Sequence, residues 1–558
     1  MTQRPVLAWL FSLSFLSVAV AGCGDDDAGS VDSGTEIDGG NTEIDAGNTS
    51  IDGGACTTPT QCGLVWEQKA SDRFVSILNQ PTELAAFLTA VPKGGDLHNH
   101  LSGAVYAETY LGWGMMSGYC INNTSFAAVA SGQCGNAGIS AIPTSGTFFD
   151  QIVRAWSMKD FVASAAESGH DHFFATFGKY GLIAGNRRDD SIADIAARAA
   201  SENQLYIETM FNLGTNVGGL SASIWSGTLT AADLPTLYSQ LMANAAFTTE
   251  LGQDVTAVTN AATRWRTALN CAGATPPPAC GVTVRFVAQI SRTGGNDQIF
   301  GQLVSAFEMA SRTNFLVGAN LSSPEDDTAS LRNYDLHMAM LDFLHQRYKV
   351  MATTPSPLHI TLHAGELTPA YVPAGFPNAT TYHVRAAVEI AHAERIGHGL
   401  DVLMETDSTG LLTTMKNRNV LVEICLSSND QILEVRGNAH PLAAYMAAGV
   451  PVALATDDQG VSRSSIAGEM LRAAKDQGLS YRQLKTMARN SLEHAFLPGP
   501  SLWSSFASVT PVADCAPTAT SAVGETPSAA CQTFLAASER AAMQWELERR
   551  FRAFEMMQ

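Results

Sequence analysis

The sequence predicts an α/β fold of the (β/α)8, or TIM-barrel, type. Eight short apolar stretches alternate with longer helical stretches between about residues 92 and 458, which is typical of parallel strand–helix units. Each apolar stretch turns polar at its end, as expected where functional side chains gather at the C-terminal ends of barrel strands. The expected strands span residues 94–103, 204–212, 282–292, 315–323, 358–366, 393–400, 420–429 and 450–458.

The composition describes a globular chain with ample material for a core. Of its 558 residues, 46% are hydrophobic and 15% are charged. The formal net charge of −20 disfavours nucleic acid and anionic membrane surfaces as partners, because both attract basic proteins. Much of the excess negative charge lies outside the expected barrel, since residues 25–54 hold nine acidic residues and no Lys or Arg.

The N-terminus is predicted to be a targeting segment. Residues 1–23 combine Arg4, an apolar run too short to span a bilayer stably, and small residues before Cys23. The ending VAGC resembles a bacterial lipobox, which predicts cleavage before Cys23 and lipidation of its thiol. We therefore expect an exported lipoprotein at the periplasmic face or the cell surface, touching the membrane only through this anchor. An ordinary secretory signal with an incidental cysteine is the alternative.

Residues 24–63 are expected to form a disordered, acidic, Gly-rich linker. Three copies of one heptad, GTEIDGG (34–40), NTEIDAG (41–47) and NTSIDGG (48–54), follow one another. Such a sequence cannot bury a core and suits a flexible tether.

The barrel domain is expected over residues 64–510, followed by a disulfide-bearing loop and a C-terminal helix packed on the barrel over residues 511–558. Two insertions, residues 105–150 and 213–281, each follow a strand, so both are expected on the active-site face as partial covers. Residues 64–92 could form a dimerising arm or a cover for the barrel bottom, which leaves an oligomer open.

The ten cysteines suit an oxidising compartment. Cys23 is assigned to lipidation, and Cys425, in the apolar run VLVEICLSSN, is expected to be a buried thiol. No CxxC occurs, so a Cys-rich zinc site is not expected. The other eight fall into local pairs that we expect to be disulfides: Cys56/Cys62, Cys120/Cys134, Cys271/Cys280 and Cys515/Cys531.

The first expected strand carries a His-x-His pair, His98 and His100. Side chains at i and i+2 of a strand share a face, so both imidazoles would converge on one point. Such a pair alone also fits two strand-end histidines bound to water. His363 and Asp457, at the ends of the fifth and eighth strands, would complete a catalytic zinc site that keeps a position open for water.

Zinc-bound water could supply hydroxide near neutral pH. Attack on an aromatic C–N carbon also requires a proton donor for the ring nitrogen and a group that orients the water. Glu366, three residues beyond His363, and His398, on the sixth strand, are placed for these roles.

Other polar residues near strand ends and helix starts are expected to be structural. They are Glu208, Arg292, Asn429 and His440. His170 and His172 form a second His-x-His pair, but in a stretch with helical spacing, where i and i+2 do not face each other.

Six segments resemble successive motifs of the adenosine deaminase family, in the family's order. They are PKGGDLHNHLSGA (92–104), LVGANLSSPEDD (316–327), HAGE (363–366), RIGHG (395–399), EICLSSN (423–429) and HPLAAYMAAGVPVALATDD (440–458). The secreted branch, the adenosine deaminase-related growth factors, is the closer likeness. The resemblance implies a TIM barrel of the metal-dependent hydrolase (amidohydrolase) kind.

The resemblance also implies a metal centre and its catalytic groups. The ligands of one Zn²⁺ per chain would be His98, His100, His363 and Asp457. Glu366 would protonate N1 of the purine, and His398 would steer the water as base or electrostatic stabiliser. Asp457 would also hold the water through a hydrogen bond.

Three residues would contact the substrate. Asp458 would contact N7, and the backbone of Gly318 would approach the N3 edge of the purine. Ser102 stands where the intracellular enzymes typically have an acidic residue that contacts the ribose. A further departure is Gln459, which replaces the proline of the family's TDDPG.

The implied activity is zinc-dependent hydrolytic deamination of adenosine, and of 2′-deoxyadenosine, to inosine and ammonia. The partner would be a small-molecule purine nucleoside. A deaminase of another adenine nucleoside or nucleotide is the nearer alternative. Binding a 5′-phosphate would require a cluster of Lys or Arg, however, and the strand ends offer mainly Arg292. A catalytically idle nucleoside-binding module is the third. The base-editing zinc deaminases are excluded, because the chain lacks their PCxxC-type site.

Overall fold

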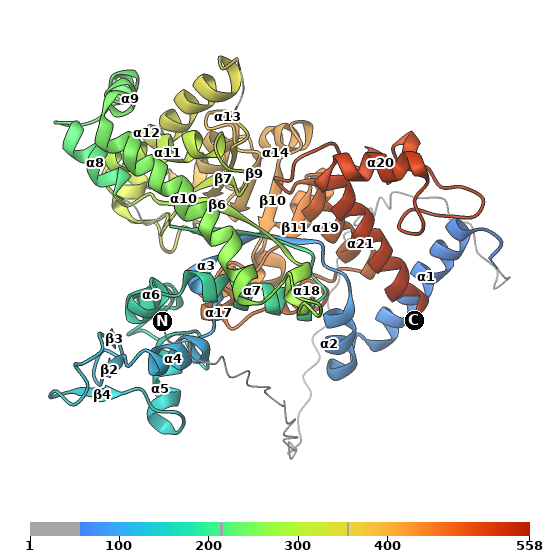
Figure 1. The fold of residues 1–558 in the computed structure, drawn as a ribbon, viewed down its shortest axis with the longest axis horizontal. Coiled ribbons are helices and arrows are strands. Elements are labelled where there is room, and N and C mark those ends of the chain that lie inside the picture. The colour runs from blue at the N-terminus through green and yellow to red at the C-terminus, as the bar shows by residue number, and fades with distance from the viewer. Residues whose placement is uncertain (1–55, 213–215, 354–355) are drawn as a thin grey trace, which may run out of the picture. The chain divides into compact units, whose positions relative to one another are not determined.

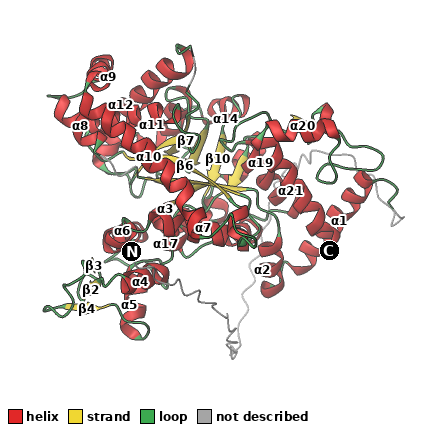
Figure 2. Cartoon of the chain, in the orientation of Figure 1, coloured by secondary structure: helices red, strands yellow, loops and turns green. Residues whose placement is uncertain are grey.

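The computed structural model describes residues 56–212, 216–353 and 356–558. Cys23, the expected signal segment and most of the expected linker lie outside these residues. Eight parallel strands form one sheet, in chain order around the ring, and helices surround it (Figure 1; Figure 2). All eight predicted strands are present. They are β1 (Gly95–His100), β5 (Tyr206–Phe211), β6 (Thr283–Ser291), β7 (Leu316–Ser322), β8 (His359–Ala364), β9 (Arg395–His398), β10 (Leu421–Ile424) and β11 (Val452–Leu454).

The barrel closes between its first and last strands. Asn99 lies opposite Asp457 in an isolated parallel bridge. The backbone N–H of Asp457 donates to the carbonyl of His98 at 2.8 Å, and that of His100 donates to the carbonyl of Asp457 at 3.2 Å. The predicted (β/α)8 barrel is therefore confirmed, and candidate metal ligands build the seam that closes it.

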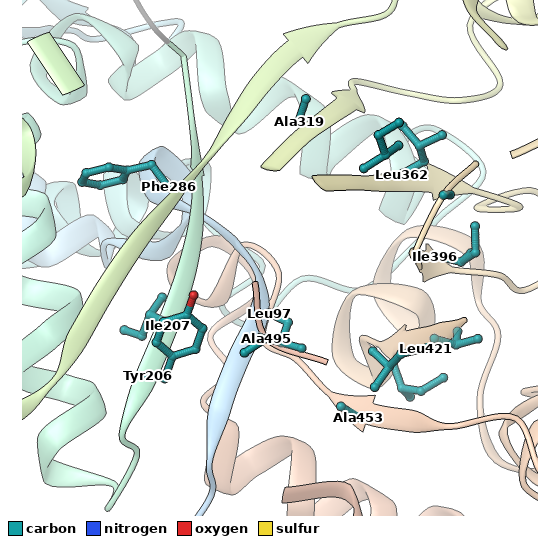
Figure 3. Packing of buried hydrophobic residues seen from close by; sticks show 14 of the residues in the cluster. Leu97, Tyr206, Ile207, Phe286, Ala319, Leu362, Ile396, Leu421, Ala453 and Ala495 are labelled. Atoms are coloured by element: carbon teal, nitrogen blue, oxygen red, sulfur yellow. The ribbon is translucent and has the colours of Figure 1, made fainter. Parts of the chain in front are cut away.

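Both faces of the strands are buried. All residues of β5 and β7 are buried, which explains why apolar residues do not simply alternate with polar ones along these strands, and why their few polar side chains are buried too. Figure 3 shows Leu97, Ile207, Phe286, Leu362 and Leu421, from five different strands, in one buried cluster.

The helices after the strands form the outer layer. They are α7 (Arg188–Ser201), α11 (Asn296–Ala310), α12 (Thr328–His345), α13 (His383–Glu389), α14 (Ser408–Asn417), α15 (Leu426–Leu433), α16 (Leu442–Ala448), α17 (Gln459–Ser462), α18 (Ile466–Asp476) and α19 (Tyr481–Glu493). A capping box of Ser480 and Gln483 begins α19, which explains why that helix starts where it does. In the described part of the chain, no helix is both long and apolar enough to cross a bilayer.

The first insertion (105–150) packs over the segments that follow β9, β10 and β11, on the active-site face as predicted, but none of its residues, all of which the structure describes, borders the pocket at the barrel mouth. It follows α3 (Leu101–Ala104) and holds α4 (Ala107–Met116), a small antiparallel sheet of β2 (Cys120–Asn122), β3 (Ala128–Val129) and β4 (Ile139–Ala141), and the start of α5 (Thr147–Ala155). The pocket is bordered instead by α6 (Gly169–Ala184), which lies beyond the predicted bounds (Figure 1). The apolar cluster of the insertion includes Leu400, Ile432 and Val461, which follow β9, β10 and β11. These contacts fix α6 over the mouth of the barrel.

The second insertion differs from the expectation. It forms α8 (Val217–Ile224), α9 (Leu234–Ala243) and α10 (Ala245–Ala268), with α8 packed on α11 and α10 on α7. Phe247, Leu251 and Trp265 are part of the main core. None of its described residues borders the pocket at the barrel mouth. It extends the outer helical layer because its apolar faces find their partners there.

The two ends of the described chain pack together on one side of the barrel. Helix α1 (Pro59–Ile77) contacts α21 (Glu539–Met556), and α2 (Pro81–Ala90) contacts α18. Lys485 of α19 lies 2.6 Å from both Glu67 of α1 and Glu555 of α21. The helices of residues 64–90 thus pack on their own chain. The expected linker boundary at residue 64 falls inside α1, because Thr58 caps a helix that begins at Pro59.

The predictions of the disulfides and of the buried free thiol are confirmed. All four expected pairs are disulfides: Cys56–Cys62, Cys120–Cys134, Cys271–Cys280 and Cys515–Cys531. Cys425 is free and buried.

Candidate active site

Four side chains that are far apart in the sequence converge at the barrel mouth. His98 and His100 come from β1, His363 comes from β8, and Asp457 follows β11. All four are buried, and their candidate ligand atoms lie within 4.8 Å of one another. The structure therefore brings together the whole ligand set that the sequence proposed.

Hydrogen bonds behind two of these histidines test whether the cluster fits a cation. His98 Nδ1 lies 2.7 Å from a carboxylate oxygen of Glu423, which accepts only, so Nδ1 carries the proton. His363 Nδ1 lies 2.7 Å from Asn320 Oδ1, which also accepts from the His363 backbone N–H. In the neutral rings, both Nε2 atoms therefore present lone pairs, and they lie 3.1 Å apart. Facing lone pairs repel unless a cation binds them, so the residues fit a metal ion.

The burial of His363 favours the same conclusion. Burial, reinforced by His98 and His100 beside it, holds the pKa of His363 well below its ordinary value. The ring is therefore neutral at pH 7, which is the form that binds metal ions.

Glu366 borders the site in surroundings that favour its protonated form. Burial, followed by the negative charge of Asp457, raises the pKa of Glu366 well above its ordinary value. Its backbone N–H donates to a carboxylate oxygen of Glu325 at 2.9 Å, and the N–H of Gly365 donates to the other at 3.1 Å. Glu325 thus fixes the turn that presents Glu366 to the pocket.

His398 and Asp457 occupy strained backbone positions. Their φ angles are +71° and +55°, in the left-handed region that residues with side chains rarely adopt. Each residue sits where a strand gives way to a loop. Burial lowers the pKa of His398 to about 3, so its ring is neutral at pH 7. Its Nε2 lies 3.7 Å from Glu366 Oε1.

Asp458 is a second buried acid. Burial, followed by the charges of Asp457 and Glu366, raises the pKa of Asp458 well above its ordinary value. It packs against Gly103, where a Cβ would lie 1.6 Å from Asp458 Oδ1, so only glycine permits this approach. The carboxyl group of Asp458 is thus available as a hydrogen-bond donor.

These groups surround a pocket of about 310 Å³, a volume suited to a small ligand. Its apolar lining comes mainly from α6 and α15, and most of its other lining residues are polar. The lining residues are His100, Phe173, Phe174, Phe177, Gln289, Ser323, Pro324, His363, Glu366, His398, Ile432, Asp457 and Asp458. The described lining contains three carboxyl groups and neither Lys nor Arg.

Two expected substrate contacts are not brought to the pocket. Gly318 is the third residue of β7, beside the first residue of β8, and a Cβ there would meet the Phe496 ring at 3.2 Å. Only the C-terminal end of β7 reaches the mouth, so Ser323 and Pro324 border the pocket instead. Ser102 is exposed and does not line the pocket, and its carbonyl accepts a hydrogen bond from Tyr110.

Several supporting residues were missed or were assigned a purely structural role. Each ligand histidine has a polar partner: Glu423 for His98, Asn320 for His363 and Gln289 for His100. Asn429 hydrogen-bonds to His398 at 2.9 Å. Glu423, Asn320 and Asn429 all lie in the segments that resemble family motifs, which is the sequence signal that could have found them.

The aromatic wall of the pocket also escaped the sequence analysis. Phe173, Phe174 and Phe177 lie on α6, at helical spacing in HFFATF. Aromatic residues at this spacing more often pack in a hydrophobic core than contact a ligand. Only the position of α6 over the barrel mouth shows that these three line the pocket.

The remaining candidates are structural, as expected. Arg292 donates to the His363 carbonyl at 3.2 Å, and Glu208 pairs with Arg395 at 2.5 Å. His172 of α6 hydrogen-bonds to Glu167 at 3.0 Å, away from the ligand cluster.

Comparisons with known proteins agree with the motifs. The adenosine deaminase family model matches residues 258–502. The adenosine deaminases of Escherichia coli O1:K1 / APEC and Escherichia coli strain SE11 are each 35% identical over 140 residues, which is 25% of this chain. The match spans 38% of the length of these relatives.

Similar solved structures include adenine deaminase from Arthrobacter aurescens, at 17% identity and a TM-score of 0.44, covering 73% of this chain and 94% of that one. Arabidopsis ADAL complexed with IMP is 20% identical, with a TM-score of 0.45, covering 73% of this chain and 93% of that one.

Proposed function

We propose that this chain is an adenosine deaminase that hydrolyses adenosine and 2′-deoxyadenosine to inosine (or 2′-deoxyinosine) and ammonia, using one Zn²⁺ per chain; the match to the adenosine deaminase family model and to adenosine deaminases supports this. The observation that carries the proposal is the buried cluster of His98, His100, His363 and Asp457 beside Glu366, whose pKa is raised by burial. Three imidazole nitrogens and one carboxylate are a donor set that suits Zn²⁺. When bound, the ion lowers the pKa of water, so that hydroxide is available near neutral pH.

The residues around the cluster supply the remaining chemistry. Glu366 gives its proton to purine N1 as C6 accepts the oxygen of water, which leaves C6 tetrahedral. The C6–N6 bond then breaks, and the amino group leaves as ammonia with one proton of the water. The other proton of the water restores Glu366, and the oxygen stays on C6 as the carbonyl of inosine. His398 orients the water, and Asp458 donates its proton in a hydrogen bond to the lone pair of N7.

The pocket lining supports a purine nucleoside rather than a nucleotide. Phe174 and Phe177 offer half-buried aromatic faces for a flat base. A 5′-phosphate would meet three carboxyl groups and no lining Lys or Arg in the described pocket. Arg292 is only 1% exposed, and one of its nitrogens already donates to the His363 carbonyl.

Activity measurements on the purified chain test the proposal. Adenosine, AMP and adenine are offered separately, and ultraviolet absorbance follows their conversion with and without a chelator. We expect conversion of adenosine that a chelator abolishes and Zn²⁺ restores. Turnover of AMP alone would refute the substrate, and turnover insensitive to the chelator would refute the metal. Binding of adenosine without turnover would favour an idle nucleoside-binding module.

We also propose that the enzyme is exported and held at a membrane through lipid on Cys23. The support is the VAGC ending of an apolar N-terminal segment and the acidic repeats that follow. Labelled palmitate fed to expressing cells should enter the wild-type chain but not Cys23→Ser. If the wild-type chain is unlabelled and absent from the membrane fraction, the N-terminal segment is an ordinary secretory signal and Cys23 is not lipidated.

A further inference from the structure

A chain of three hydrogen bonds leads from the start of α16 to His398. It begins at the backbone N–H of Leu442, which donates to His440 Nδ1 at 3.1 Å. A backbone N–H can only donate, so His440 Nδ1 holds a lone pair. Burial lowers the pKa of His440 to about 4, so the ring is neutral at pH 7 and its proton is on Nε2.

The second bond orients an amide. His440 Nε2 lies 3.2 Å from Asn429 Oδ1. Because Nε2 carries the proton, it requires an acceptor, and the reversed amide would place two donors face to face. The Nδ2 group of Asn429 must therefore point the other way, towards His398 Nδ1 at 2.9 Å.

The third bond sets the tautomer of His398. An amide NH₂ group only donates, so His398 Nδ1 accepts and the proton of the neutral ring is on Nε2. This Nε2 is buried and has no hydrogen-bond partner among the described residues. His398 also borders the pocket. A buried donor without a partner at a pocket wall is expected to donate a hydrogen bond to a molecule bound in the pocket.

We infer that Asn429 and His440 are positioning residues that hold His398 with its proton on Nε2, directed at the attacking oxygen. His398 then acts as a hydrogen-bond donor that stabilises charge on that oxygen, rather than as the base that removes its proton. The catalytic meaning of this assignment rests on the proposed function, whereas the tautomer follows from the hydrogen bonds alone.

The tautomer can be read directly by nuclear magnetic resonance. The Zn²⁺-loaded full chain is labelled with ¹⁵N-histidine, and long-range ¹H–¹⁵N correlations identify the protonated nitrogen of each ring. A spectrum of His398→Gln assigns the His398 signals. We expect the proton on Nε2, and a wild-type His398 protonated on Nδ1 overturns the inference.

Asn429→Asp is the sharpest variant, because it keeps the size of the side chain but replaces the NH₂ donor with an acceptor. The carboxylate should draw a proton onto His398 Nδ1. We expect kcat to fall by about 10²- to 10³-fold with KM changed by less than about threefold, since an oriented donor is lost. An unchanged His398 spectrum in this variant also overturns the inference.

His440 provides a matched pair. His440→Gln can accept from Leu442 and donate to Asn429, as the neutral imidazole does, so it should keep the tautomer and most of kcat. His440→Leu removes both bonds and should mix the His398 tautomers. If the two variants give identical His398 spectra, His440 has no positioning role and the relay is refuted.

The outcomes separate this inference from the proposed function. Wild-type protein with the proton on Nε2 but no turnover of adenosine upholds the relay and refutes the deaminase. Turnover of adenosine by a protein with the His398 proton on Nδ1 supports the deaminase and refutes the relay. The wild-type spectrum decides the tautomer even if Asn429→Asp fails to fold.

Discussion

At the scale of single residues, the surroundings of a side chain decide its chemistry. A carboxyl group near the protein surface is ionised at pH 7, whereas Glu366 is 8% exposed and lies near the charge of Asp457. Both features penalise its charged form, so the same residue type becomes a proton donor.

Glu366→Gln should therefore abolish proton donation without disturbing the metal. We expect kcat/KM for adenosine to fall by about 10²- to 10⁴-fold, the usual contribution of a general acid. Bound zinc, measured by elemental analysis, should stay at one per chain. Glu83→Gln, a matched change at an exposed side chain of α2, should leave the rate unchanged. Full activity in Glu366→Gln would remove Glu366 from the mechanism.

The raised pKa of Glu366 also predicts a pH dependence. The residue acts in its protonated form, which is populated below its raised pKa and lost above it. We therefore expect kcat/KM to stay level on the acid side of that pKa and to decline as pH rises through it. A pH–rate profile of the zinc-loaded enzyme measures this, and a rate that keeps rising with pH would contradict it.

At the scale of elements, short strands and close contacts set the position of each ligand. β9 is only four residues long, and its Gly397 lies under the ring of His98, which comes from β1 and not from either strand paired with β9. A Cβ on Gly397 would lie 2.5 Å from His98 Cε1, closer than carbon atoms can approach. The ring could stay only if the strands moved apart.

Gly397→Ala should therefore displace His98 and empty the metal site. We expect zinc content well below one per chain and loss of turnover, with the circular dichroism of the fold retained. Gly181→Ala is the matched control, because nothing lies within 4 Å of a Cβ at that position in α6. Normal zinc content in Gly397→Ala would show that the strand adapts.

Aromatic side chains of α6 line the pocket, and the proposed function predicts that they contact the purine base. Phe177→Ala should raise KM for adenosine by about 5- to 30-fold with little change in kcat, because about 1–2 kcal/mol of apolar contact is lost from ground and transition states alike. Leu182→Ala, at an exposed position of the same helix, is the control. An unchanged KM would show that the base does not contact this wall.

At the scale of the whole molecule, the metal site and the barrel seam are one structure. His98, His100 and Asp457 make the backbone contacts between the first and last strands, while His363 comes from β8. An ion bound by all four joins the two ends of the sheet. Metal binding is therefore expected to stabilise the fold as well as the chemistry.

Removal of the metal should lower the melting temperature. Metal at a thousandfold excess over its dissociation constant stabilises the native state by about 4 kcal/mol, provided that the unfolded chain does not bind it. Scanning calorimetry with and without a chelator should show the shift in the wild type and not in His363→Ala. If the wild type melts at the same temperature with and without the chelator, metal binding does not stabilise the seam.

The sequence by itself determined the eight strands, the disulfide pairs and the four candidate metal ligands, because each is a local pattern: apolar runs with polar ends, neighbouring cysteines and short motifs. Only the tertiary structure decided that Gly318 lies too early in β7 to reach the pocket, that α6 supplies an aromatic wall, and that Asn429 contacts His398. Which residue on a strand reaches the mouth, and which helix covers it, depends on register and packing between segments distant in the chain. The spacing of residues along the chain therefore predicts neither the residue that reaches the mouth nor the helix that covers it.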